Sequence, residues 1–343
     1  MQTKIFQINS PNDTEKIEAA AAILRNGGLV AIPTETVYGL AANALDGEAV
    51  AKIFKAKGRP QDNPLIVHIS RFEEVFPLVK AVPDMAVKLA DAFWPGPLTI
   101  VLEKTTLIPH EVSAGLDTVA VRMPSHPVAR ALIKAAGVPL AAPSANTSGS
   151  PSPTSARHVL DDLEGRIDAV VDAGKCAVGV ESTVITLAGK IPRLLRPGGI
   201  TPEQLEAVLG KIEIDLAVFS APSMGETPAS PGMKYKHYSP KARLIIVKGN
   251  LPEFIDYVQK DASSNTAVLC YEGEQEMMPV KAIGFGRLEN PAEQAQRLFS
   301  ALRQIDALPH VQTVFARCPA TRGLSLAVYN RLLRAAAFEV IEL

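Results

Sequence analysis

The chain has 343 residues, of which 47% are hydrophobic and 21% are charged, with 35 Lys and Arg against 36 Asp and Glu. The charged content is near the ordinary ~25%, which argues against a disordered chain, and the length favours two domains of about 100–200 residues each. The formal net charge of −1 provides no overall field for holding a nucleic-acid backbone. The unusual figures are 27 prolines and an aromatic content of only 5%.

The three cysteines, Cys176, Cys270 and Cys318, lie far apart and form no C-x-x-C pair. We therefore expect neither a disulfide scaffold nor a structural zinc site. The first residues turn polar at once, unlike a signal peptide, and no apolar run approaches the ~18 residues of a membrane span. A soluble, cytoplasmic protein is predicted.

Strand-like and helix-like segments alternate along the first 200 residues, which predicts a mixed, twisted sheet covered by helices. Residues 14–26, for example, carry apolar side chains at helical spacing before Gly27-Gly28 ends the helix. Further helices are predicted over 48–57, 84–93, 126–136 and 202–209. Strands are predicted over 29–32, 64–69, 98–102, 118–122, 169–172 and 182–187.

The pattern changes after residue 210. Residues 211–242 hold four prolines without lasting periodicity, which is typical of a linker. Beyond it we predict a smaller Rossmann-like α/β domain. Its strands are expected over 243–247, 266–270, 280–285 and 311–316, and its helices over 252–260, 291–305 and 324–336. The predicted domains are thus a catalytic domain (1–210), a linker (211–242) and a C-terminal domain (243–343).

Common catalytic motifs are absent from the sequence. There is no G-x-x-x-x-G-K-[ST] loop, no H-E-x-x-H and no G-x-S-x-G elbow, and the 6 histidines are not spaced as metal ligands. Polar clusters at strand ends remain. The segment P-T-E-T-V-Y-G-L (33–40) places Glu35 and hydroxyls directly after an apolar strand, where ligands bind in open α/β sheets. Taken alone, the segment favours a polar turn with a satisfied buried Glu35, because turns favour such residues.

Cations gather just after the second predicted helix. Lys57 and Arg59 precede Pro60 on a stiff turn, which suits a polyphosphate site, although a capped, solvated helix end explains them as well. His68 lies within a strand, where a core histidine is common. Arg122 lies on an apolar strand and needs an anionic partner, either an internal carboxylate or a substrate carboxylate.

Small and hydroxylated residues form the loop A-P-S-A-N-T-S-G (142–149), which leaves its backbone open to a ligand or is a plain Ser/Pro loop. The short segments E-S-T (181–183) and R-P-G-G (196–199) adjoin further strands. Together these strand ends are rich in cations and hydroxyls and poor in general bases, which favours an anion-binding site.

Several of these segments occur here in one order: P-T-E-T-V-Y-G-L, K-G-R-P with N-P-L, W-P-G-P-L-T, V-A-V-R-M-P, A-P-S-A-N-x-S-G, E-S-T-V and L-R-P-G-G-I. Together they resemble the YrdC-like domain of threonylcarbamoyl-AMP synthases, over about residues 12–200. The run S-P-G-M-K-Y-K-H-Y-S-P (230–240) and the C-terminal domain resemble the long, two-domain form of that family.

The resemblance implies an L-threonylcarbamoyladenylate synthase, a nucleotidyltransferase. Such enzymes convert L-threonine, bicarbonate or CO2, and ATP into threonylcarbamoyl-AMP and diphosphate, and a separate transfer machinery then modifies tRNA. Mg2+ would be held mainly by the ATP phosphates, with no metal ligands from the protein, and direct tRNA contact would be weak or absent.

Carried over residue by residue, the resemblance implies the catalytic set Lys57, Arg59, Ser144 and Asn146. ATP contacts are implied for Arg59, Asn63, Thr118, Ser144, Ser152, Arg196 and Tyr235. L-threonine contacts are implied for Thr36, His68, Arg122, the Ala142 backbone and Ser182. Through Tyr235, the linker and the C-terminal domain would form a lid over the site.

Two alternatives share the same module. A carbamoyl-adenylating maturation factor also carries zinc-finger cysteine pairs, which the isolated cysteines here do not form. An RNA-binding YrdC-like protein would need a basic face, and residues 1–210 are not basic.

Overall fold

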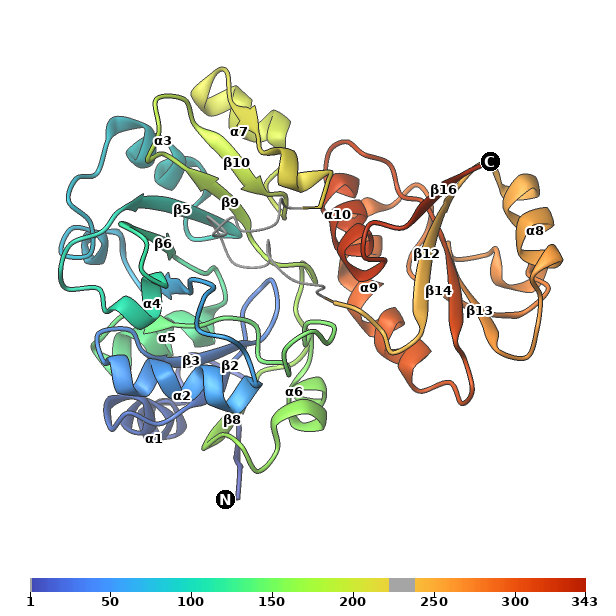
Figure 1. Cartoon of the computed structure of the whole chain (residues 1–343). Helices are drawn as coiled ribbons and strands as arrows, with labels where there is room; N and C mark the ends of the chain where they lie inside the picture. Colours follow the sequence, from blue (N-terminus) through green and yellow to red (C-terminus); the bar gives the residue numbers. More distant parts are fainter. Residues whose placement is uncertain (1, 222–237) are drawn as a thin grey trace. The chain divides into compact units, whose positions relative to one another are not determined.

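The computed structural model describes residues 2–221 and 238–343 (Figure 1). The chain divides into two compact units, the first comprising Met1–Ser148 and Ser152–Val218 and the second lying mainly in the chain after the undescribed segment. Half of the predicted linker, including Tyr235, lies outside the described residues, so its boundaries stay a prediction. None of the described helices has the length and apolar character needed to cross a membrane.

The first unit is built on an 11-stranded sheet in the order β1-β8-β2-β3-β7-β4-β6-β5-β9-β10-β11. Parallel pairs such as β4 with β6 alternate with antiparallel pairs such as β5 with β6, which confirms the predicted mixed sheet. Its strands are β1 (Lys4–Gln7), β2 (Val30–Ile32), β3 (Gly39–Asn43), β4 (Ile66–His68), β5 (Leu98–Glu103), β6 (Thr118–Arg122), β7 (Leu140–Ala141), β8 (Ala169–Asp172), β9 (Thr183–Thr186), β10 (Arg193–Arg196) and β11 (Glu213–Ile214).

The helices of this unit largely follow the predicted periodicity. They are α1 (Thr14–Arg25), α2 (Gly47–Lys57), α3 (Asp84–Phe93), α4 (His110–Ser113), α5 (Pro127–Ala136), α6 (Ala156–Leu163) and α7 (Pro202–Leu209), with the short 3-10 helices η1 (Phe72–Val75) and η2 (Leu216–Val218). Helix α6 was not predicted, because it follows a Ser/Pro-rich loop. Its start depends on Ser155, whose hydroxyl accepts a hydrogen bond from the backbone N–H of His158.

The sheet has two unlike faces. On one, α2, α3 and α6 pack against a large apolar core that includes Leu40, Val121 and Ile185. On the other, α1 and α5 lie side by side over β2, β3 and β8 (Figure 1). Over β4, β6, β5, β9 and β10 the described residues of this second face form a small apolar cluster of Ile66, Val101, Ala120, Val184 and Leu195. The candidate site described below borders that cluster.

The second unit contains a 5-stranded sheet in the order β14-β13-β15-β12-β16, with every pair parallel. Helices α9 and α10 cover one face and α8 the other (Figure 1). Because β15 lies between β13 and β12, the order differs from the classical Rossmann order, although the doubly wound layers agree with the prediction. Its elements are β12 (Arg243–Lys248), α8 (Leu251–Lys260), β13 (Thr266–Cys270), η3 (Gln275–Met277), β14 (Lys281–Gly284), α9 (Pro291–Asp306), β15 (Thr313–Arg317), α10 (Ser325–Ala335) and β16 (Val340–Glu342).

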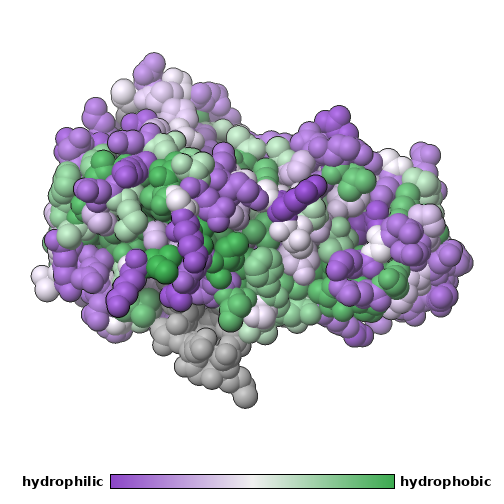
Figure 2. Space-filling view, turned by 90° about the horizontal axis from the view of Figure 1, so that it is seen from above, coloured by the Kyte–Doolittle hydropathy of each residue, from purple (hydrophilic) through white to green (hydrophobic). Residues whose placement is uncertain are grey.

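Hydrophilic and hydrophobic residues are interspersed over the face of the molecule in Figure 2. The site must therefore be sought in local contacts.

Gly198 marks a close approach of two loops in the first unit. A Cβ at this position would lie 2.2 Å from the backbone nitrogen of Thr183 and 2.6 Å from the carbonyl oxygen of Glu181. Only a residue without a side chain therefore lets the R-P-G-G loop lie against the E-S-T segment.

We predict that Gly198→Ala lowers the free energy of unfolding by about 1–3 kcal/mol, because the backbone must shift to admit the methyl group. Urea denaturation measures the change. Gly189→Ala is the matched control, since a Cβ there would meet nothing closer than 3.8 Å. Equal stability of both variants would contradict this explanation.

Candidate active site

The centre of the candidate site is a buried ion pair. Nη2 of Arg122, at the end of β6, donates to Oε1 of Glu35 at 2.7 Å, and the two side chains are only 4% and 9% exposed. Nη1 of Arg122 donates to the Thr36 hydroxyl at 2.9 Å. The sequence left open whether Arg122 pairs with an internal carboxylate or with a substrate carboxylate. The structure supplies the internal carboxylate.

The charges at this centre are set by burial and by the pair itself. Burial raises the pKa of Glu35, but the charge and hydrogen bond of Arg122 outweigh it, so the net pKa lies below its ordinary value. His68 lies beside Arg122 in the β4–β6 register. Burial, followed by the charge of Arg122, lowers the pKa of His68 to about 3. The imidazole is thus neutral at physiological pH.

Strand pairing and side-chain hydrogen bonds place this centre close to the E-S-T segment. Thr99 lies opposite Arg122 in the β5–β6 pair, and its hydroxyl is 2.8 Å from the hydroxyl of Ser182. Arg196 donates from Nη2 to the Ser182 hydroxyl at 3.1 Å and from Nε to the Ser182 carbonyl at 3.0 Å. Thr36, Arg122, Ser182 and Arg196 are therefore brought together.

Lys57 holds the Ser/Asn loop. Its ammonium group donates to the backbone carbonyls of Ser144 and, at 2.6 Å, of Asn146, while the Ser148 N–H donates to the Lys57 carbonyl at 2.9 Å. Burial, and then the charge of Arg59, holds the pKa of Lys57 well below its usual range. The K-x-R pair therefore contacts the S-x-N pair directly, through Lys57. The sequence pattern could not indicate that this contact is made with backbone carbonyls.

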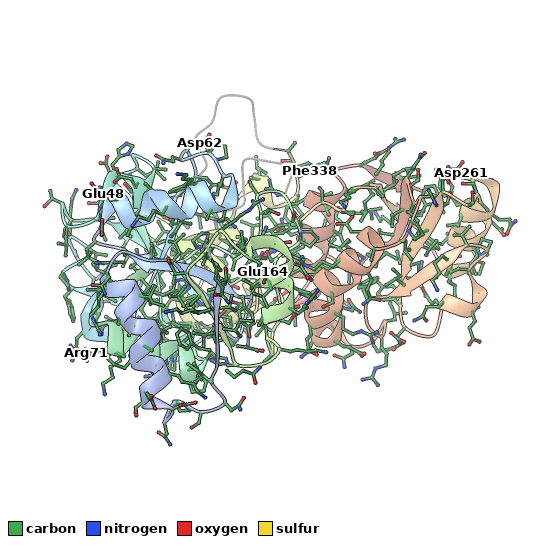
Figure 3. All side chains as sticks on the ribbon, turned by 90° about the horizontal axis from the view of Figure 1, so that it is seen from below. Glu48, Asp62, Arg71, Glu164, Asp261 and Phe338 are labelled. Atoms are coloured by element: carbon green, nitrogen blue, oxygen red, sulfur yellow. The ribbon has the colours of Figure 1, made fainter. Side chains whose placement is uncertain are left out.

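The turn after α2, marked by Asp62 in Figure 3, carries Arg59 and Asn63. Nη2 of Arg59 donates to the Asn63 carbonyl at 3.2 Å. The side-chain amide of Asn63 is almost fully buried, and neither Nδ2 nor Oδ1 has a hydrogen-bond partner among the described residues. Such a group is costly to bury unless a hydrogen-bond partner satisfies it, and a bound ligand or a water molecule can be that partner.

Thr118 lies at the opposite end of β6 from Arg122. Residues 118, 120 and 122 of a strand point to one face, so Thr118, Ala120 and Arg122 share the face that bears the small apolar cluster. The four steps between Thr118 and Arg122 span about 13 Å. One end of this face therefore carries Arg122 and His68, and the other carries Thr118.

The remaining predicted residues lie close to these. Ser152 is buried, and its hydroxyl donates to Oε1 of Glu181, next to Ser182. The backbone N–H of Ala142 donates to the Ile66 carbonyl at 3.0 Å. Sequence reasoning did not include Glu35, Thr99 and Glu181 among the site residues. Glu35 and Glu181 had a signal, since each stands in a polar segment at a strand end, whereas Thr99 is found only through its partner.

Comparison with known proteins identifies the family of the chain. A family model of the Sua5, YciO and YrdC group, described as telomere recombination, matches residues 22–198, and a model described as the C-terminal domain of threonylcarbamoyl-AMP synthase matches residues 200–337. A threonylcarbamoyl-AMP synthase of Pyrococcus abyssi is 46% identical and covers 99% of both chains. The chain belongs to the threonylcarbamoyl-AMP synthase family.

Other members of the family are similarly close. The Bacillus subtilis threonylcarbamoyl-AMP synthase is 47% identical over 97% of this chain and 96% of its own. Among solved structures, P. abyssi Sua5 complexed with L-threonine superposes with a TM-score of 0.91 at 44% identity, covering 99% of this chain and 100% of that one. The family resemblance inferred from the motifs is confirmed.

The low pKa of His68 predicts a pH dependence of stability. The pKa is about 3 in the folded chain against an ordinary value of 6.5, so between these values the unfolded chain binds the extra proton. The contribution of His68 is therefore complete above pH 6.5 and is lost as the pH falls, at up to about 1.4 kcal/mol per pH unit.

Urea denaturation of the full chain between pH 4 and 7 tests this. His68→Gln carries no ionisable group at this position, so its free energy of unfolding should fall less steeply on acidification than that of the parent chain. If the free energy of unfolding fell equally steeply with pH in both proteins, His68 would not be the source of the pH dependence.

Proposed function

We propose that this chain is an L-threonylcarbamoyladenylate synthase, a nucleotidyltransferase that forms threonylcarbamoyl-AMP and diphosphate from L-threonine, bicarbonate or CO2, and ATP. The observation that carries the proposal is the shared face of β4 and β6, with Arg122, Thr36 and His68 at one end and Thr118 at the other. Relatives that match almost the whole chain bear the name of this enzyme, which supports the proposal.

The reaction needs positioning more than a strong base. The amine of L-threonine adds to CO2 and releases a proton, giving a carbamate. A carbamate oxygen then attacks the α-phosphorus of ATP, the bond to the bridging oxygen breaks, and diphosphate leaves. Cations and hydrogen-bond donors that face the spreading negative charge accelerate such a transfer. A site with arginines and hydroxyls but no catalytic triad fits this chemistry.

The amino acid would occupy the Arg122 end of the shared face, and the nucleotide would extend from there, beside Ser152 and Arg196, to the Thr118 end. Arg122, Thr36, His68, Ser182 and the Ala142 backbone would bind L-threonine. The nucleotide would be bound by Arg59, Asn63, Thr118, Ser144, Asn146, Ser152 and Arg196, and by Tyr235, which lies outside the described residues. The small apolar cluster between the two ends would form the floor beneath the sugar and base. The unpartnered amide of Asn63 supports a ligand at its end.

Lys57 would act through the loop that it holds. Its ammonium group is committed to two backbone carbonyls, which fixes Ser144 and Asn146 in place beside the phosphates. Arg59, half-buried at the same turn, would supply the positive charge that contacts the phosphates directly.

ATP is bound by enzymes as its Mg2+ complex, and this ion prefers oxygen ligands. Within residues 2–221 and 238–343, no group of three or more His, Cys, Asp and Glu side chains is placed to hold a metal ion. The phosphate oxygens and water would therefore provide most of its ligands, and the bound ion would offset phosphate charge.

The product is an activated intermediate for tRNA modification. Because tRNA is modified inside the cell, the protein would act in the cytoplasm and pass threonylcarbamoyl-AMP to a separate transfer machinery. With the net charge at −1, direct contact with tRNA would be weak.

The activity is tested by diphosphate release. The purified full-length chain should form diphosphate from ATP only when L-threonine and bicarbonate are both present. Release without either substrate, or no release with both, would overturn the proposal.

Arg59→Ala and Lys57→Ala should each lower the rate of diphosphate formation by about 100-fold or more, since the first removes a phosphate contact and the second releases the loop. Lys55→Ala is the matched control, because Lys55 is an exposed residue of the same helix. Circular dichroism verifies that each variant is folded. Equal rates for all three variants would contradict these roles.

A further inference from the structure

Glu35 has one committed and one unsatisfied carboxylate oxygen. Oε1 accepts the hydrogen bond from Arg122, whereas Oε2 is buried and has no hydrogen-bond partner among the described residues. The side chain is more than nine-tenths buried, so the missing partner is unusual for an ionised group. Glu35 lies on the same turn as Thr36, one of the residues proposed to bind L-threonine.

The charged neighbours of Glu35 are few. His68, His126 and Cys176 are close enough to influence or feel its charge. Burial lowers the pKa of both histidines and raises that of Cys176 to about 12, so all three are neutral near pH 7. Among the described residues, Arg122 is then the charged group that balances Glu35, and the backbone N–H groups of Glu35 and Ser125 lower the pKa of Glu35 further.

Arg122 retains donors for a ligand. A guanidinium group has five N–H donors, and three are used on Glu35, Thr36 and the Gly96 carbonyl within the described part of the chain. The other two can bind a ligand carboxylate. That carboxylate would lie beside Glu35 on the same guanidinium, so two negative charges would face one positive charge in a buried site.

A second positive charge is needed to balance this arrangement. In an α-amino acid the ammonium group is attached to the carbon next to the carboxylate, so a carboxylate bound by Arg122 brings the ammonium group to Glu35. We propose that Oε2 of Glu35 binds the α-ammonium group of the amino acid substrate and thereby makes the site selective for zwitterions. This assignment rests on the proposed function and concerns binding only.

The charge balance predicts that loss of the Glu35 charge affects an amino acid and its α-hydroxy acid analogue differently. Isothermal titration calorimetry on the full-length chain would compare L-threonine with its α-hydroxy acid analogue, in which a hydroxyl replaces the ammonium group. The parent chain should bind L-threonine at least about tenfold more tightly. Glu35→Gln should weaken L-threonine binding at least about tenfold, and should leave binding of the analogue unchanged or make it tighter, because the carboxylate no longer meets a second negative charge.

The controls separate this role from a purely positioning one. If Glu35 only held Arg122 in place, Glu35→Gln would weaken both ligands alike, which would overturn the inference. Glu73→Gln, at an exposed glutamate of the same unit, should change neither affinity. Arg122→Gln should weaken L-threonine binding, since it removes the partner of the carboxylate.

Three further outcomes are informative. If Glu35→Gln does not fold, the affinities of the parent chain still test the inference. Equal affinity of the parent chain for L-threonine and the α-hydroxy analogue would overturn it. Failure of the parent chain to bind L-threonine with or without ATP would overturn the proposed function as well. A third outcome is that Arg122→Gln abolishes binding while the parent chain binds L-threonine and the α-hydroxy analogue equally well. That result would overturn only the role of Glu35.

Discussion

The ion pair between Glu35 and Arg122 is the contact on which the arrangement of the site depends. Neither charge can be left alone in a buried position, and removing one partner of such a pair costs about 3–5 kcal/mol. The turn after β2 and the end of β6 are therefore obliged to meet, although they are 87 residues apart in the chain. Through Thr99, the same arginine is linked to Ser182 and so to Arg196. Two sets of hydrogen bonds, placed next to each other by the β5–β6 register, thus connect these segments.

Backbone groups hold the rest of the site. The Leu40 N–H donates to the Pro143 carbonyl at 2.7 Å, and the Ala145 N–H donates to the Tyr38 carbonyl at 2.8 Å, so two of the sequence motifs pair with each other directly. Lys57 adds its ammonium group to the carbonyls of the same loop. Proline suits such loops because it restricts the backbone without adding a donor that would need a partner. The high proline content thus belongs to a site whose shape is set by the backbone.

Much of the fold could be predicted from the sequence, because amphipathic spacing and Gly or Pro boundaries are local signals. Helices α3 and α7 were predicted with the bounds that the structure has. Strand β3 was not predicted, since G-L-A-A-N has little preference for a strand and is extended because it pairs with β2 and β7. The insertion of β15 between β13 and β12 likewise depends on long-range packing. In the site, the need of Arg122 for an anion was predictable, but its partner was not, because pairing across the chain leaves no local pattern.

The placement of Thr118 and Arg122 on one strand constrains how this part of the protein can change over time. Side chains alternate between the two faces of a strand, so one inserted or deleted residue between them would turn one of the two to the opposite face. The loops around the site can change in length and still keep the hydrogen bonds that hold them at the site. Strand β6 has no such freedom, because its length and its register with β4 together define the spacing between Arg122 and Thr118, the two ends of the proposed substrate site. A change in substrate size would therefore be accommodated by the loops, while the central strand kept its number of residues.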